Sequence, residues 1–524
     1  MDNNDIHPEA NPRRWAILGV LCLSLLLIVV DNTIVNVALP TFVRDLHATT
    51  SQLQWIVDAY TLFFACLLLT AGALGDRRGR KGMLTLGLIV FGVASLAAAL
   101  GSSTGQLIAT RAVMGVGAAM IMPATLSILT NVFTNPKERA AAIGIWSAVS
   151  GLAIALGPVA GGFLLAHFWW GSIFLVNVPI VAITIIVGGV MIPTSKDGST
   201  AKLDLKGAAL SIIGLGALVW AVIEAPSKGW TSTPIVAAFA VGALVLVGFA
   251  LLESRLTDPM LNVRFFKNMR FTAASLSITL LFFALTGFIF GVAQYLQGVL
   301  GYSALGAGVR TLPFAAAVMV FAPLSPKLVD RVGTKALVAG GLGTFAIGLL
   351  IASSMKVDSS YTLVMVAMLV MGSGMGLAMA PATESVMGSL PREAAGVGSA
   401  VNDTTRELGS TLGVAVGGSA IASVYAGRIG DALAGQPIPP AALKVAKDSL
   451  GGALAVAQQA GERGPALTAL ARKAFTDGLR VDTLITAGVA VLGMIVAAAF
   501  LPSRADAAVV EVDELEQELV SARF

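Results

Sequence analysis

Charged residues are scarce in this sequence: Asp, Glu, Lys and Arg together make up 12% of 524 residues, against about 25% in typical soluble proteins. Hydrophobic residues make up 56%, and the mean hydropathy is +0.83. Ordinary soluble cores cannot bury that much apolar surface, and long uncharged runs recur from residue 15 to residue 501. The composition therefore excludes a soluble multidomain protein and indicates an all-α polytopic membrane protein.

Cysteine and histidine are also rare. The two cysteines, Cys22 and Cys66, lie in separate apolar stretches, and the three histidines are dispersed along the chain. These residues are too few and too far apart for a disulfide framework or a metal cluster. The sequence also lacks a P-loop and a recognisable nucleophile constellation. We therefore expect no metal, no cofactor and no enzymatic activity.

The excess of basic residues has a membrane explanation. A sequence pI near 9.1 would suggest nucleic acid as a partner of a soluble protein, but in a membrane protein Lys and Arg collect in cytoplasmic loops. We therefore expect the lipid bilayer as a partner, and no nucleic acid.

Fourteen apolar runs are long enough to cross a bilayer, which takes about 20 residues in a helix. They lie at residues 15–39, 52–74, 83–101, 106–133, 140–167, 170–192, 205–224, 234–252, 271–297, 305–325, 336–353, 361–383, 396–425 and 483–501. An even number of spans places both termini on one side. If that side is the cytoplasm, 21 of the 34 Lys and Arg fall in cytoplasmic segments and only 3 in short outer loops, as the positive-inside rule requires. We expect a multi-pass protein of the cytoplasmic membrane with both termini in the cytoplasm.

An internal repeat indicates how the spans are grouped. The pattern D-R-x-G-x-K occurs at 76–81 and again at 330–335, each time after the second span of a six-span group if spans 7 and 8 are an insert. The predicted arrangement is thus 6+2+6. Its parts are a cytoplasmic tail (1–14), a six-helix bundle (15–193), a two-helix insert with linkers (194–268), a second six-helix bundle (269–503) and an acidic cytoplasmic tail (504–524).

The connection between spans 13 and 14, residues 426–478, is unusually long for an outer loop. Residues 440–447 and 466–473 carry the spacing of amphipathic helices, which predicts an outer helical hairpin. A disordered linker is the alternative.

Ionisable groups inside spans are costly in lipid and are therefore candidates for function. Asp31, Asp58 and Arg111 all fall in the outer half of their helices, so an Asp–Arg pair or triad that exchanges partners on protonation is geometrically allowed. A fixed ion pair that only braces the bundle is the alternative.

A second charged group lies in span 13. Asp403 and Glu407 are four residues apart and share one helix face, where two carboxylates resist simultaneous ionisation. Such a pair suits a proton carrier, and it would also attract an organic cation and release it on protonation. Arg406 points to a different face and is a charge partner for a neighbour.

Span 5 contains Gly157, Pro158, Gly161 and Gly162 within 157–162. The GxxxG spacing permits close packing and the proline permits a bend, which predicts a hinge or a sealing surface. Plain helix packing is the alternative.

Taken in order, these segments resemble the major facilitator superfamily, and within it the fourteen-helix drug:proton antiporters of the quaternary-ammonium (Qac) exporter type. The resemblance spans residues 14–503. The matching strings are DNTIVNVALP (31–40), WIVDAY (55–60), GALGDRRGRK (72–81), RAVMGVG (111–117), GPVAGG (157–162) and FLVNVP (174–179).

The resemblance implies an MFS fold and proton-driven export of lipophilic, cationic drugs or toxic compounds by a chain that works as a monomer. It implies that Asp31, Asp58, Asp403 and Glu407 are proton-coupling or cation-binding positions. It also implies a cytoplasmic gate motif made of Gly72, Asp76, Arg77, Gly79 and Arg80. A dedicated exporter of one endogenous metabolite or antibiotic is the alternative. Residues 315–320 are wholly apolar, where some dication exporters carry an acid, so we expect no strong handling of dications.

Overall fold

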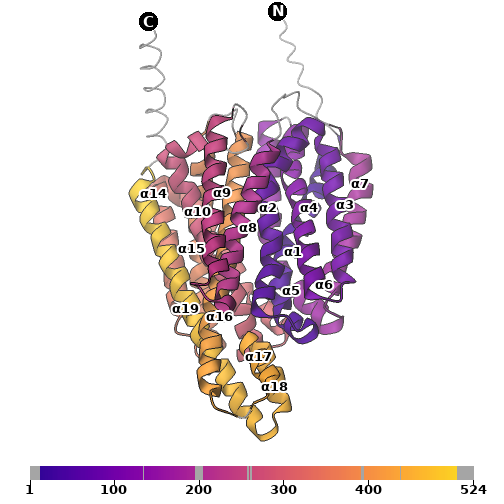
Figure 1. The fold of residues 1–524 in the computed structure, drawn as a ribbon. Helices are drawn as coiled ribbons and strands as arrows, with labels where there is room; N and C mark the ends of the chain where they lie inside the picture. The colour runs from indigo at the N-terminus through magenta and orange to yellow at the C-terminus, as the bar shows by residue number, and fades with distance from the viewer. Residues whose placement is uncertain are drawn as a thin grey trace, which may run out of the picture.

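The computed structural model describes residues 12–133, 135–194, 204–256, 259, 263–390, 395–436 and 438–503. Within these ranges the ordered elements are all helices, and no strand occurs. The long helices stand side by side (Figure 1). The end at which α1 (Arg14–Leu46) begins and α19 (Gly464–Phe500) ends is called the terminal end below. The opposite end, where α17 (Pro440–Asp448) and α18 (Leu450–Gln459) project, is called the hairpin end.

The first bundle runs from α1 to α7. Its remaining helices are α2 (Thr50–Arg78), α3 (Arg80–Ala99), α4 (Thr104–Val132), α5 (Pro136–His167), α6 (Ser172–Leu175) and α7 (Asn177–Met191). The predicted sixth span is thus divided into a short and a long helix.

Two helices, α8 (Leu205–Lys228) and α9 (Thr233–Arg255), connect the bundles. Helix α8 packs against both α2 and α16. Val219 and Ile223 of α8 are buried against Ala415 of α16. Helix α9 packs mainly on α8 and exposes an apolar stripe that includes Leu244 and Val247. Such a stripe needs lipid around it.

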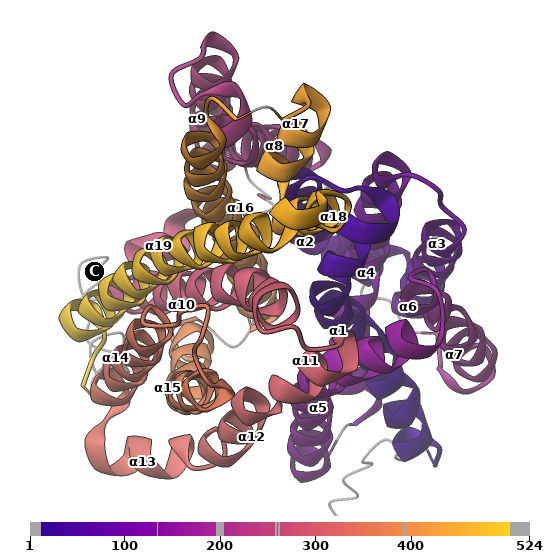
Figure 2. The ribbon, with the colours of Figure 1, turned by 90° about the horizontal axis from the view of Figure 1, so that it is seen from below.

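The second bundle begins after a short 3-10 turn, η1 (Val263–Lys267). It consists of α10 (Met269–Gln294), the π-helical turn η2 (Tyr295–Val299), α11 (Ala304–Arg310), α12 (Leu312–Phe321), α13 (Ser325–Val332), α14 (Thr334–Ala352), α15 (Tyr361–Met387) and α16 (Ala395–Leu433), followed by α17, α18, the 3-10 turn η4 (Gly461–Arg463) and α19. Seen from the hairpin end, the two bundles lie next to each other, with α1 and α5 of the first facing α10 and α11 of the second (Figure 2).

Local sequence explains where several helices begin. Thr49 and Gln52 form a reciprocal capping box at the start of α2, and Ser103 and Asn268 cap α4 and α10 through their side chains. These caps satisfy backbone N–H groups that have no partner within the helix. In lipid such satisfaction is a requirement for any spanning segment.

Thirteen helical segments among the described residues are long and apolar enough to cross a membrane, and Leu152–His167 in α5 is a shorter apolar helix. The chain is therefore a multi-pass membrane protein.

The repeated D-R-x-G-x-K pattern has the same backbone structure in both copies. Gly79 separates α2 from α3 with φ 113°, and Gly333 separates α13 from α14 with φ 84°. Each glycine also donates its N–H to a carbonyl four residues earlier, of Gly75 and of Val329. Only glycine adopts such positive φ values readily, so the pattern encodes a tight helix-to-helix turn that occurs once in each bundle.

The prediction for residues 466–473 was wrong in one respect. These residues do not form a separate hairpin helix, because they are the beginning of the 37-residue helix α19. The second short helix is α18, which begins at the Ser449 cap. Its Gly- and Ala-rich sequence has little amphipathic pattern, so periodicity did not reveal it.

Candidate functional site

A cavity lies at the centre of the molecule, between the two bundles. The first bundle lines it with residues of α1, α2, α4 and α5. The second bundle lines it with residues of α10, α12, α15 and α16, and with Thr311 between α11 and α12. Most of these side chains are apolar, including Phe282, Phe288, Phe314, Met368 and Met375. The cavity volume is about 190 Å³, below the roughly 300–1,000 Å³ of pockets that bury drug-sized molecules. A larger ligand would therefore require the bundles to separate further.

The charged residues of α16 face this cavity. Asp403, Arg406 and Glu407 all line it. Arg406 does more than point to another face, because its Nη1 lies 3.6 Å from Asp403 Oδ1 and its guanidinium lies 4.8 Å from the centre of the Phe282 ring. Arg406 thus offsets the charge of Asp403. Glu407 Oε2 is buried without a hydrogen-bond partner among the described residues.

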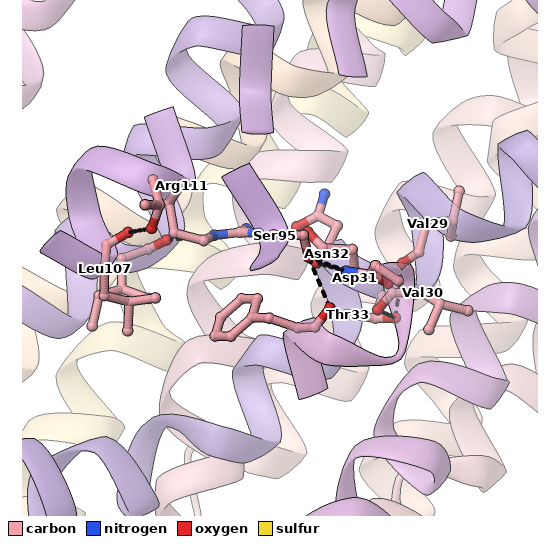
Figure 3. A network of polar contacts seen from close by, with 12 residues as sticks. Val29, Val30, Asp31, Asn32, Thr33, Ser95, Leu107 and Arg111 are labelled. Carbon is pink, nitrogen blue, oxygen red and sulfur yellow. Dashed lines mark hydrogen bonds and ion pairs between the residues drawn. The ribbon is translucent and has the colours of Figure 1, made fainter. Parts of the chain in front are cut away.

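Asp31 and Arg111 form a fully buried ion pair between α1 and α4. Figure 3 shows Arg111 reaching from α4 toward Asp31. Arg111 also donates through Nε to the Ile56 carbonyl at 3.0 Å and lies 4.2 Å from the centre of the Tyr60 ring. The guanidinium thus makes contacts through Nε, through Nη1 and through its flat face. The ammonium group of a lysine has no such planar arrangement of donors and could not reproduce these contacts.

Asn177 completes this network, although the sequence analysis gave it no role. Its Nδ2 donates to Asp31 Oδ1 at 2.8 Å and to Ser95 Oγ at 3.0 Å. The available signal was a buried amide inside the string FLVNVP, at the first residue of α7. Asp31 is thus held by two side chains from different helices.

Asp58 does not join the Asp31–Arg111 pair. It is fully buried on α2, and neither carboxyl oxygen has a hydrogen-bond partner among the described residues. Its neighbours Val57 and Thr61 line the central cavity, whereas Asp58, Asp31 and Arg111 do not. The structure therefore keeps the α16 group and the Asp31–Arg111 network apart, with Asp58 in neither.

The α5 motif lies against both bundles. A Cβ on Gly157 would collide with Thr33, and one on Gly161 would lie 2.5 Å from Ile34 Cγ1, so these two glycines permit close contact with α1. Gly162 instead faces α11 of the second bundle, where a Cβ would lie 2.5 Å from Leu305 Cα. Pro158 borders the cavity and lies close to Gly308 of α11.

Polar contacts also join the bundles toward the hairpin end. Gln54 Nε2 on α2 donates to the Ala415 carbonyl at 2.9 Å and to Ser419 Oγ at 3.2 Å. Thr411 Oγ1 donates to Thr61 Oγ1 at 2.9 Å. Sequence reasoning missed Gln54, a polar residue in an apolar span next to the WIVDAY string. Together with the α5–α11 contact, these bonds close the cavity on the hairpin side.

The gate motif lies at the terminal end, between α2 and α3. Gly72 faces Pro123 of α4, where a Cβ on the glycine would lie 3.4 Å from Pro123 Cβ, and Gly79 and Arg80 lie at the turn into α3. The side chains of Asp76 and Arg77 lie outside the described part of the structure.

No group of three or more His, Cys, Asp or Glu among the described residues is placed to hold a metal ion. One further buried carboxylate, Asp482, was missed because the last span was expected to begin at residue 483. It lies well inside α19.

Comparison with known proteins agrees with this architecture. The model of the family described as Major Facilitator Superfamily matches residues 21–414. The chain is 37% identical to the multidrug efflux pump LfrA of Mycolicibacterium smegmatis, covering 91% of this chain and 94% of that protein. It is 33% identical to the tetracenomycin C resistance and export protein of Streptomyces glaucescens, covering 80% and 77%.

Among solved structures, the fold is similar to that of a bacterial homologue of the human lysosomal transporter Spinster in an inward-facing, unoccupied conformation. The TM-score is 0.64 at 18% identity, covering 94% of this chain and 98% of the other. With the family match over residues 21–414, the fold and the two-bundle cavity lead to one conclusion: the chain belongs to the Major Facilitator Superfamily of membrane transporters.

Proposed function

We propose that this transporter exports lipophilic, cationic compounds across the cytoplasmic membrane in exchange for protons. The observation that carries the proposal is the placement of Asp403 and Glu407 on the wall of a largely apolar cavity between the bundles. Apolar and aromatic side chains favour a lipophilic ligand, and a carboxylate among them favours a positive charge. The names of the relatives as a multidrug efflux pump and as a resistance and export protein agree with export.

Competition for Glu407 would give the cycle its direction. Arg406 already offsets Asp403, so Glu407 is the carboxylate free to bind either a proton or an organic cation. A proton bound there removes the charge that attracts the cation. This difference in affinity between the two states is what drives release and return in alternating access.

Asp31, Asp58 and Arg111 are proposed to respond to the same protons. Asp31 is held by Arg111 and Asn177, so a proton on Asp31 would weaken its attraction to Arg111. Asp58 is buried without a partner among the described residues. These groups lie between helices that border the cavity, so a change in their protonation would change how those helices pack.

We place the hairpin end outside the cell and both termini in the cytoplasm, because Lys and Arg are concentrated in the loops of the terminal end. We also place the chain with the fourteen-helix Qac-type antiporters, in a 6+2+6 arrangement that works as a monomer. The thirteen candidate spans, with α5 as a further helix of 32 residues, support this count. The gate motif from Gly72 to Arg80 would then latch the cytoplasmic side.

The test is transport by the full chain in everted membrane vesicles. Ethidium uptake into energised vesicles should stop when nigericin collapses the pH gradient. Uptake that continues unchanged after collapse would contradict proton antiport.

Variants separate the carboxylates from general effects on folding. Asp403→Asn and Glu407→Gln should each abolish gradient-driven ethidium transport while the protein is still made and inserted. Asp431→Asn is the matched control, since Asp431 is an exposed carboxylate near the end of the same helix. Wild-type transport by both cavity variants would rule out their role as carriers.

A dedicated exporter of one antibiotic is the second candidate. The relative named for tetracenomycin C resistance and export favours it. A susceptibility panel that compares expressing and non-expressing strains distinguishes the two, because a narrow resistance profile supports the dedicated exporter and a broad one the multidrug exporter.

A further inference from the structure

Asp482 is a buried carboxyl outside the site described above. It lies on α19 with none of its surface exposed, and neither Oδ1 nor Oδ2 has a hydrogen-bond or ion-pair partner among the described residues. It stands 18 residues before the end of α19 at Phe500, or about 27 Å along the helix axis. Asp482 is therefore in the part of the membrane nearer the hairpin end.

Three glycines make the space that its carboxyl fills. A Cβ on Gly417 of α16 would lie 2.5 Å from Asp482 Oδ1, and a Cβ on Gly287 of α10 would lie 3.4 Å from the same oxygen. A Cβ on Gly291, one turn further along α10, would lie 3.6 Å from Oδ2. The carboxyl thus occupies a hollow between α10 and α16 that longer side chains would close.

No charged side chain in the described part of these helices faces the hollow. Helix α10 presents glycines, and its only charged residue, Arg270, is at its beginning. On α16, the closest charged residue toward the terminal end is Glu407, ten residues or about 15 Å before Gly417. Arg480, two residues from Asp482, is exposed, and α14 contacts α19 elsewhere, through Met494. The other charged residues of the elements packed against α19 are Lys335 at the start of α14, Asp403, Arg406, Arg428 and Asp431 on α16, Arg472, Lys473 and Asp477 on α19, and Glu462 and Arg463 in η4.

An ionised carboxylate would be expensive in this position. Burying a charge without a partner is strongly unfavourable, whereas burying a neutral carboxylic acid costs far less. The hollow therefore fits Asp482 with a proton bound. Water could hydrate the ionised form only if α10 or α16 moved away from α19.

The hairpin end of α10 links this hollow to the contact between bundles. Helix α10 changes to the π-helical turn η2 four residues after Gly291, and such turns are often found at functional sites. Within η2, Gln297 Nε2 donates to the Val37 carbonyl of α1 at 2.9 Å, and Arg472 Nε of α19 donates to the Gly298 carbonyl at 3.1 Å. The end of α10 is thus held between α19 and the first bundle.

We propose that Asp482 is an additional proton-binding residue, and that a proton on it favours the packing of α10 against α19 and thereby the closed hairpin end. Opening the hairpin end breaks the Gln297–Val37 bond, frees the end of α10 and lets water reach Asp482, which then releases its proton. Protonation and closure favour each other by the same factor, as linkage requires. The inference rests on the proposed proton coupling and adds a site to it.

The experiment measures the opening of the hairpin end without substrate or gradient. Spin labels are placed at Ser102→Cys and Ser354→Cys, exposed positions in the hairpin-end connections of the two bundles, with Cys22 and Cys66 replaced by Ala. Double electron–electron resonance on the purified full chain then gives the ratio of long to short separations. We expect this ratio to rise about tenfold between about pH 6 and pH 9. A rise of this size corresponds to a proton that binds about tenfold more tightly in the closed state than in the open state.

Asp482→Asn copies the neutral carboxyl and should lose most of this rise, staying closed at high pH. Asp477→Asn, the same change at a partly exposed carboxylate five residues away, should behave as the parent. If Asp482→Asn does not fold, the smaller neutral variant Asp482→Ser carries the same expectation.

A full pH response in either neutral variant, or no response in the parent, would overturn the inference. Those results leave proton antiport intact if ethidium flux still follows the pH gradient. Flux that ignores the gradient would instead contradict the proposed function itself.

Discussion

Asn177 Nδ2 donates a hydrogen bond to Asp31 Oδ1 at 2.8 Å, joining two buried residues that are 146 positions apart in the sequence. The bond leaves Asp31 with an amide on one oxygen and Arg111 on the other. Such a carboxylate is both compensated in charge and fixed in direction.

Replacing Asn177 should therefore destabilise the first bundle. Asn177→Leu keeps the branching at Cγ and removes the donor, and hydrogen bonds to charged groups contribute about 1.5–3 kcal/mol. We expect a lower unfolding temperature in detergent. Thr184→Val is the control, because the Thr184 hydroxyl donates to the Ile180 carbonyl of its own helix. Equal unfolding temperatures for the Asn177 variant and the wild type would contradict the assigned role.

The Asp31–Arg111 pair offers a test between a brace and a working part of transport. Arg111→Leu leaves a buried unpaired carboxylate and should cost about 3–5 kcal/mol. The double variant Asp31→Asn with Arg111→Leu removes both charges and should recover most of the unfolding temperature. If the pair works in transport, ethidium export stays lost in this stable double variant. Restored export would show that the pair only braces the bundle.

Gly162 should be intolerant of any side chain. A Cβ there would lie 2.5 Å from Leu305 Cα and 2.7 Å from the Ala304 carbonyl oxygen of the opposite bundle. Overpacking of this kind costs about 1–3 kcal/mol, which would lower the ratio of closed to open hairpin ends by about fivefold or more. We expect Gly162→Ala to reduce the rate of ethidium export without loss of protein from the membrane. Gly144→Ala on the same helix has nothing within 4 Å and should transport at the wild-type rate.

The stability of the projecting segment formed by α17 and α18 should depend on pH through Asp448, which lies outside the candidate spans. Burial raises the pKa of the Asp448 carboxyl, and the positive charge of Lys444 opposes the rise. A carboxyl whose pKa is raised by folding stabilises the fold below its unfolded pKa, and this contribution is lost as the pH rises through the folded value. The segment formed by α17 and α18 should therefore be less stable at neutral pH than in mild acid.

Hydrogen exchange of the α17 amides, corrected for intrinsic rates, measures this effect. Asp448→Asn cannot ionise, so α17 should be better protected in this variant than in the wild type at neutral pH, with the difference shrinking in acid. Asp431→Asn, at an exposed position near the end of α16, should leave α17 unchanged. Identical protection of α17 in the wild type and Asp448→Asn at every pH would refute the prediction.

Most of the helices could be read from the sequence because a membrane span must be both long and apolar. The positive-φ turns at Gly79 and Gly333 were marked by the repeated pattern that contains them. The division of the predicted tenth span into α11 and α12 was not foreseen, because Arg310 and Pro313 lie within an otherwise apolar run long enough for one span. It occurs at Thr311, just before Leu312 and Pro313 begin the new helix.

The candidate site was only partly predictable. The i,i+4 spacing of Asp403 and Glu407 fixes their shared helix face, and the cavity does lie on that side. Spacing did not reveal that Arg406 would turn toward Asp403, since its long side chain can reach several neighbours. Asp482 was missed because a charged residue in a sequence usually marks the end of an apolar span. The glycines that make room for its carboxyl lie on other helices, so the sequence around Asp482 does not reveal them.

The low charge and the long apolar runs by themselves determined that this protein lives in a membrane, and the ordered motifs pointed to its family. Those features depend on local chemistry, which neighbours in sequence are enough to set. Tertiary structure alone decided which carboxyl groups have partners. Asp31 pairs with Arg111 and accepts a hydrogen bond from Asn177, Asp403 lies beside Arg406, and Asp58 and Asp482 have no hydrogen-bond partner among the described residues. The cost of a buried charge depends on partners brought from distant helices, and only the packed structure supplies or withholds them.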